Sequence, residues 1–191
     1  MLDLPVLPNP HDNLTREEIS SFAKYYSIEG AFTPEECSEL KSLGEELVKQ
    51  AVKKHTQSNI MDMHHCFLPA DHPIHEKMKP LWLEAAKHFD FSISYVEPYK
   101  LQLYREGGFF DRHIDNYHGL NMPDDRKITA IVQLSDETEY DGGDLMIGFH
   151  TAKKKQGTLI FFPSFYPHNV KKVTKGTRWA VVAWAWGPYW K

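Results

Sequence analysis

The hydrophobic pattern of this chain changes character near residue 94, and that change constrains the fold more than any other feature of the sequence. Before it, apolar residues recur at helical spacing. After it, short apolar runs alternate with Gly, Pro and Asp in the manner of β-strands. Helices followed by strands predict an α+β domain whose helices cover one side of a mainly antiparallel sheet. The strands are expected at residues 98–105, 127–134, 144–149, 157–162, 168–173 and 177–186.

Three helices are predicted in the first half of the chain. The first begins after Thr15, which forms a capping box with Glu18 three residues later. The second begins after Thr33, with Pro34 at its first position and Glu36 as the acid of the box. The third follows from apolar residues at helical spacing around an internal proline that predicts a kink or a late start: Ile74, Met78, Pro80, Leu81, Ala85 and Phe89.

Composition limits the partners and the setting that we expect. The formal net charge is -4, from 22 basic and 26 acidic residues, which argues against a nucleic-acid or anionic-membrane partner. The N-terminal segment lacks the basic and apolar regions of a secretory signal, and no apolar segment approaches the length of a membrane span. The two cysteines, Cys37 and Cys66, are expected as reduced thiols in a cytoplasmic protein.

The segment FFDRHIDNYH carries the first chemical signal. His113 and Asp115 are two residues apart, so in a strand they point to the same face and can bind one ion. With a second histidine they would form the two-histidine, one-carboxylate arrangement that suits iron(II). A surface His and Asp at a strand edge is the alternative interpretation. Asp111 has the same spacing from His113, so spacing alone leaves both carboxylates as candidates.

A second signal lies downstream, in GTLIFFPSFYPHNVKKVTKGTRWAVVAWAW. This segment predicts a strand, a turn, His168, a second turn and a final strand that begins at Arg178, a return that can place both residues in one pocket. Ala180, Val182 and Trp184 share the face of Arg178 by the strand period of two. A guanidinium beside a buried interior needs an anion, such as the distal carboxylate of a bound dicarboxylate. A salt bridge to an acidic residue of the chain is the alternative.

Taken in order, these elements resemble the catalytic domain of prolyl 4-hydroxylases, and especially the bacterial PKHD-type hydroxylases of the 2-oxoglutarate and iron(II) oxygenase superfamily. The resemblance covers residues from about 99 to 187. It is carried by Tyr104 followed by Gly107, His113-x-Asp115, YDGGDL from Tyr140 to Leu145, GTLIFFPS, His168 and KGTRWAVVAW.

The resemblance implies a fold, and the length of the chain predicts one domain. The fold is a double-stranded β-helix, or jelly roll, with the N-terminal helices packed on one side of its major sheet. Residues 1–191 are expected to form a single oxygenase domain. In it, residues 1–95 supply an extended arm and mainly helical support, and residues 96–191 supply the jelly-roll catalytic core.

The resemblance also implies a site, and it favours Asp115 over Asp111 as the carboxylate ligand. No catalytic side chain is expected beyond the metal ligands. The implied iron ligands are His113, Asp115 and His168, and the implied cosubstrate-binding residues are Arg178, which holds the 2-oxoglutarate tail, Tyr104, which hydrogen-bonds the cosubstrate, and Trp184, which forms an aromatic wall.

The function implied by the resemblance is hydroxylation of a prolyl residue in a peptide or protein. The reaction would release succinate and carbon dioxide from 2-oxoglutarate, with ascorbate as reductant. The retained Asp115 favours hydroxylation over halogenation, because a small residue there would open a position for halide. The alternatives are a hydroxylase of a free amino acid or another small molecule, a non-enzymatic cupin-like metal-binding protein, and a zinc hydrolase, for which the sequence offers no evident general base.

Overall fold

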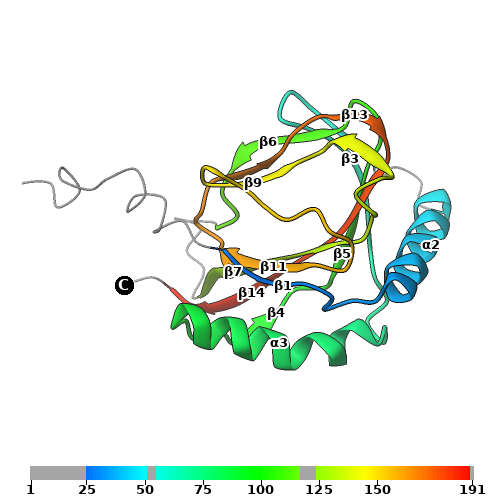
Figure 1. The fold of residues 1–191 in the computed structure, drawn as a ribbon. Helices are drawn as coiled ribbons and strands as arrows, with labels where there is room; N and C mark the ends of the chain where they lie inside the picture. The colour runs from blue at the N-terminus through cyan, green and yellow to red at the C-terminus, as the bar shows by residue number, and fades with distance from the viewer. Residues whose placement is uncertain (1–24, 51–54, 117–123, 190–191) are drawn as a thin grey trace, which may run out of the picture.

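The computed structural model describes residues 25–50, 55–116 and 124–189. Within these ranges a twelve-stranded antiparallel sheet curls back on itself, and two helices lie against one outer face (Figure 1). The helices are α2 (Pro34–Gln50) and α3 (Ile74–Phe89). The strands are β1 (Tyr26–Ile28), β2 (His55–Gln57), β3 (Met61–Phe67), β4 (Tyr95–Val96), β5 (Lys100–Tyr104), β6 (Phe109–His113), β7 (Asp124–Gln133), β8 (Tyr140–Gly142), β9 (Leu145–Ile147), β10 (His150–Thr151), β11 (Leu159–Pro163), β12 (His168–Val170), β13 (Val173–Gly176) and β14 (Arg178–Pro188).

The strand order makes the sheet two-layered. It runs β1-β11-β7-β14-β5-β3-β6-β12-β9-β10, with β2 paired to β3 and β4 paired to β14, while β13 and β8 form a separate pair. Strand β3 joins the layers, because it pairs with β5 along most of its length and with β6 through Met61 and Asp62. The layer of β11, β7, β14 and β5 therefore faces the layer of β6, β12 and β9 across an interior (Figure 1).

Both helices cover the outer face of the β11-β7-β14-β5 layer (Figure 1). Leu40 of α2 and Met78 and Trp82 of α3 belong to one buried cluster together with Trp179 and Val181 of β14. The predicted α+β class, with helices on one side of the sheet, is thus confirmed.

Local signals set the helix boundaries. At the start of α2, the Glu36 side chain accepts a 2.8 Å hydrogen bond from the Thr33 amide, and the Thr33 hydroxyl accepts a 3.2 Å bond from the Glu36 amide. This is the predicted capping box. Helix α3 begins at Ile74 and continues through Pro80, so the late start is wrong. The helix predicted after Thr15 lies outside the described residues.

Strand β14 separates the two cores. Trp179 and Val181 face the helices, whereas Ala180, Val182 and Trp184 belong to a second buried cluster inside the curled sheet. This alternation agrees with the face predicted for the final strand. Each other predicted strand has an observed counterpart, although residues 168–173 divide into β12 and the start of β13. No helix of the described residues is long and apolar enough to cross a membrane.

Candidate metal centre

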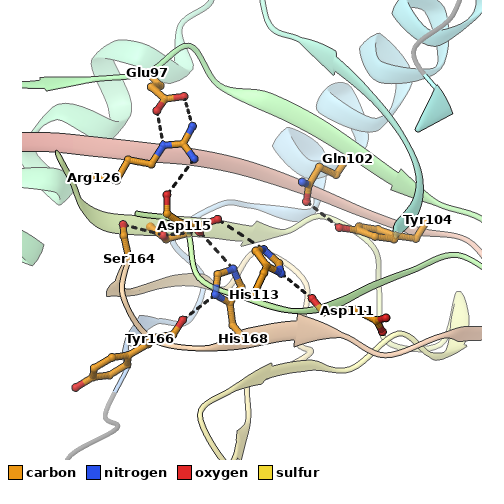
Figure 2. Close-up of polar contacts among 11 residues, drawn as sticks. Glu97, Gln102, Tyr104, Asp111, His113, Asp115, Arg126, Ser164, Tyr166 and His168 are labelled. Atoms are coloured by element: carbon orange, nitrogen blue, oxygen red, sulfur yellow. Dashed lines mark hydrogen bonds and ion pairs between the residues drawn. The ribbon is translucent and has the colours of Figure 1, made fainter. Parts of the chain in front are cut away.

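Three side chains that could hold a metal ion converge between the layers. His113 ends β6, Asp115 follows two residues later, and His168 begins β12. His113 and His168 are register partners, which brings the two imidazoles side by side. Nε2 of His168 lies 3.3 Å from Oδ2 of Asp115, and Nε2 of His113 lies 3.6 Å from Oδ1 (Figure 2). One ligand atom from each residue lies within 4.8 Å of the other two.

Both imidazoles are oriented by the backbone. Nδ1 of His113 lies 2.7 Å from the carbonyl oxygen of Asp111, and Nδ1 of His168 lies 2.9 Å from that of Tyr166 (Figure 2). A carbonyl can only accept, so each Nδ1 carries the proton and each Nε2 presents a lone pair to the cluster. The carboxylate in the cluster is Asp115, and Asp111 contributes its backbone while its side chain is exposed.

Asp115 is fixed through both its side chain and its backbone. The Thr129 hydroxyl donates a 2.8 Å hydrogen bond to Oδ2, and it lies 3.0 Å from the Ser164 hydroxyl. Thr129 has a single hydroxyl hydrogen, so Ser164 donates to Thr129. The amide of Asp115 donates to the carbonyl of Ser164 at 2.8 Å, and its carbonyl accepts a 3.3 Å bond from Nη1 of Arg126. Asp115 therefore has little freedom to leave the cluster.

The electrostatics of the cluster favour a bound cation. Burial disfavours the charged form of Asp115, but the hydrogen bond and charge of His168, with smaller contributions from Trp184 and His113, hold its pKa below the usual range. The pKa of His113 is lowered, first by burial and then by His168. A carboxylate and a neutral imidazole at neutral pH are ligands that a borderline divalent metal accepts.

Arg178 lies at the start of β14, opposite Tyr104 of β5 in the register. It is 1% exposed, and Nη2 donates a 2.8 Å hydrogen bond to Oε1 of Gln133. Its Nε and Nη1 atoms are buried without a hydrogen-bond partner. Within the described ranges no carboxylate forms an ion pair with Arg178, so the alternative of an internal salt bridge is not observed there. Buried donors of a guanidinium that lack partners are costly unless a ligand supplies an acceptor.

The remaining predicted residues lie around the same interior. The Tyr104 hydroxyl donates a 3.2 Å hydrogen bond to Gln102, and the ring centroid is 5.3 Å from Cζ of Arg178. Burial raises the pKa of Tyr104, and the Arg178 charge partly offsets the rise. Trp184 stacks on Arg126, with Cζ 3.9 Å from the ring centroid. One cavity is lined by the three cluster residues, Tyr104 and Trp184 together with Gln102, Phe110, Ile131, Leu145, Val170 and Val182.

Several supporting residues have no counterpart among the predicted site residues. Gln102, Thr129 and Gln133 are buried polar residues on inward-facing positions of strands that are otherwise apolar. The sequence signal for such a residue is a polar side chain that shares, by the strand period of two, the face of a predicted strand that points inward. This signal could have identified Gln102, because Gln102 stands two residues before the predicted site residue Tyr104 and so shares its face of the strand.

Comparison with known proteins identifies the family. The model of the 2OG-Fe(II) oxygenase superfamily matches residues 99–186. The PKHD-type hydroxylase PiuC of Pseudomonas aeruginosa is 30% identical over 172 residues, which cover 82% of this chain and 76% of the relative. The residues matched by the family model, 99–186, are nearly the whole segment on which the resemblance in the sequence rests.

Solved structures support the same fold. The crystal structure of a Pseudomonas putida prolyl-4-hydroxylase superposes with a TM-score of 0.71 at 16% identity, covering 84% of this chain and 91% of that one. A Trichoplax adhaerens prolyl hydroxylase, solved in complex with a hypoxia inducible factor peptide fragment, superposes with a TM-score of 0.63 at 17% identity. The match covers 86% of this chain and 84% of that one. The double-stranded β-helix predicted from the sequence is therefore confirmed. The chain belongs to the 2-oxoglutarate- and iron(II)-dependent oxygenase superfamily, among the PKHD-type, prolyl 4-hydroxylase-like oxidoreductases.

Proposed function

We propose that this protein hydroxylates a prolyl residue in a peptide or protein, using iron(II) and 2-oxoglutarate and releasing succinate and carbon dioxide. The observation that carries the proposal is the buried guanidinium of Arg178, which has two donors without partners and lies beside the cavity that contains a His, Asp, His cluster. A metal-binding protein without a cosubstrate would gain nothing from that buried charge.

The three cluster residues fit iron(II). His113, Asp115 and His168 would hold the ion through two imidazole nitrogens and one carboxylate, a donor set that leaves positions for other ligands. Bound iron(II) supplies the redox chemistry that couples oxidative decarboxylation of 2-oxoglutarate to insertion of oxygen into a C–H bond. Thr129 and Ser164 keep the Asp115 carboxylate turned toward the ion.

The cosubstrate pocket fits a dicarboxylate. Nε and Nη1 of Arg178 still have N–H groups that can donate to the distal carboxylate, while Nη2 donates to Gln133. The Tyr104 hydroxyl adds a donor from the neighbouring strand. Apolar side chains of Ile131 and Val182 line the cavity beside them, which helps to exclude water from the reacting groups.

The substrate assignment is supported by the relatives. The Trichoplax prolyl hydroxylase of similar fold was solved with a peptide fragment bound, and the Pseudomonas putida enzyme is a prolyl-4-hydroxylase. In this chain Trp184 forms part of the cavity wall, where an aromatic ring can pack against a pyrrolidine ring. Ascorbate is proposed as the reductant that maintains iron(II).

The test is incubation of purified protein with iron(II), ascorbate, 2-oxoglutarate and oxygen, with succinate as the first readout. Mass spectrometry of a proline-containing peptide library is the second readout, and we expect a gain of one oxygen on proline. Oxygen gained only by free amino acids would reassign the substrate. Metal binding without any succinate release would support a cupin-like protein, and hydrolytic activity with zinc but none with iron would support a hydrolase.

A further inference from the structure

Lys100 is a cation on the inward face of β5 for which the site described above has no role. It stands two residues before Gln102, which lines the cavity, and it is opposite Val182 and Phe67 on the flanking strands. Its Nζ atom lies 5.0 Å from the ring centroid of Trp184 and 5.3 Å from that of Phe67. The ammonium therefore lies at the edge of the metal cavity, between two aromatic rings.

Within the ranges that the structure describes, Lys100 forms no ion pair with an acidic residue. The two acidic residues whose charges act on Lys100, Glu97 and Asp115, already have other partners. Glu97 accepts bonds of 2.5 and 2.8 Å from Arg126 and one of 2.5 Å from Trp186. Asp115 belongs to the metal cluster. Burial and the neighbouring Arg126 lower the pKa of Lys100, and Glu97 and Asp115 offset this only in part.

Formal charges in the loaded site leave Lys100 unbalanced. The negative charges of Asp115 and of the two carboxylates of 2-oxoglutarate balance the positive charges of a bound iron(II) and of Arg178. The charge of Glu97 balances that of Arg126. The Lys100 ammonium then remains without a counter-charge in a half-buried position, beside Trp184 of the cavity wall. Electrostatic complementarity at such a position favours an anionic ligand.

We propose that Lys100 binds a carboxylate of the substrate and thereby selects substrates with an acidic group close to the carbon that is hydroxylated. This inference rests on the proposed function and deepens it. The carboxylate can belong to an acidic side chain next to the target residue or to the free C-terminus of a short substrate. Phe67 and Trp184 flank the ammonium and hold it at the edge of the cavity.

Binding measured without turnover tests this role. The full-length protein is loaded with iron(II) and 2-oxoglutarate without oxygen, and calorimetry compares capped peptides with Glu or Gln on either side of proline. A second pair compares acetyl-Gly-Pro with a free carboxylate and as its amide. We expect at least one carboxylate probe to bind about tenfold more tightly than its amide counterpart. The pair that discriminates identifies the source of the carboxylate.

The variants separate charge recognition from packing. Lys100→Met should reduce the preference to less than about twofold, because methionine keeps the apolar stem and removes the charge. Lys100→Arg should retain most of the preference, and Lys100→Glu should turn it toward peptides with lysine in place of glutamate. The dissociation constant of 2-oxoglutarate should be unchanged in Lys100→Met. Lys87→Met, an exposed lysine of α3, is the matched control and should behave as the unaltered protein.

Equal binding of every carboxylate and amide pair by the unaltered protein would overturn the proposal, as would a preference that survives in Lys100→Met. A loss of 2-oxoglutarate binding in that variant would assign Lys100 to the cosubstrate instead. The same peptides with alanine in place of proline keep this test separate from the prolyl assignment. Acid preference with no proline preference would refute the prolyl substrate and leave the Lys100 role intact.

Discussion

Arg178 donates a 2.8 Å hydrogen bond from Nη2 to Oε1 of Gln133, and both residues are almost completely buried. The amide of Gln133 is itself oriented, because its Nε2 donates a 3.1 Å hydrogen bond to the carbonyl of Lys153. Gln133 therefore presents its oxygen to the guanidinium and leaves Nε and Nη1 of Arg178 for a ligand.

Gln133→Leu should weaken binding of 2-oxoglutarate, because Arg178 would lose the acceptor that positions it. We expect the KM for 2-oxoglutarate to rise by about tenfold, the effect of one hydrogen bond to a charged group. Succinate release as a function of 2-oxoglutarate concentration measures it. Gln133→Glu should raise this KM further, since a carboxylate would compete for the guanidinium. An unchanged KM in Gln133→Glu would contradict the role of Arg178 as anchor.

Arg178→Ala should raise the cosubstrate requirement far more than it weakens metal binding. Removing one partner of a buried charge pair costs about 2–5 kcal/mol, which corresponds to a rise in KM of at least about thirtyfold. Calorimetry with 2-oxoglutarate and titration with Mn(II) measure the two affinities separately. An equal loss of both would show that Arg178 supports the metal cluster and does not anchor the cosubstrate.

Asp115→Ala should abolish metal binding, while Asp111→Ala should leave it intact. Asp111 orients His113 through its backbone carbonyl, and alanine retains that carbonyl. Electron paramagnetic resonance of added Mn(II) reports the free ion and therefore the affinity of each variant. Loss of binding in Asp111→Ala with retention in Asp115→Ala would transfer the ligand role.

Thr129→Val should weaken both the metal site and the fold. Valine has the shape of threonine but removes the hydroxyl that donates to Asp115 and accepts from Ser164. Loss of such a partner to a metal ligand lowers metal affinity by about 10–100-fold. Buried groups left without partners cost about 1–3 kcal/mol of unfolding free energy. Mn(II) titration and urea denaturation check the two effects, and Thr129→Ser, which keeps the hydroxyl, should show much smaller ones.

Gly44→Ala should destabilise the protein although alanine favours a helix. A Cβ atom at Gly44 of α2 would lie 2.6 and 2.9 Å from ring atoms of Trp179 and 3.3 Å from Cδ1 of Leu101. Overpacking of this kind costs about 1–3 kcal/mol, against a gain of about 1 kcal/mol in helix propensity. Urea denaturation measures the difference, with the exposed Ser42→Ala in the same helix as control. A more stable Gly44→Ala would show that α2 packs less closely on β14.

Local chemistry made much of the fold predictable. The reciprocal bonds of Thr33 and Glu36 are a property of four consecutive residues, so the start of α2 could be inferred from the sequence. The strand period likewise predicted which face of the last strand carries Arg178 and Trp184. The proximity of His113 and His168 depends on pairing between β6 and β12, and the order of motifs in the family resemblance anticipated it.

Long-range pairing accounts for what the sequence did not predict. Strand β3 joins the two layers, yet it was absent from the predicted strands, because its partners β5 and β6 lie far along the chain. Gln133 and Lys100 were missed for a related reason. A polar residue at the end of an apolar strand is ordinary by itself, and its meaning depends on which side chain the neighbouring strand places opposite it.

Because the two faces of β14 pack against different parts of the protein, the number of residues in this strand matters as much as their identity. From Trp179 to Ala185 its odd-numbered residues face the helices, while its even-numbered residues face the interior of the curled sheet. Loss of a single residue within the strand would therefore exchange the two faces on one side of the deletion. If the rest of β14 kept its pairing with β7, Arg178 would move to the position of Trp179 among the helix side chains, and Thr177 would take the position of the guanidinium. A one-codon deletion would thus remove folding and cosubstrate binding together, whereas point substitutions can separate them.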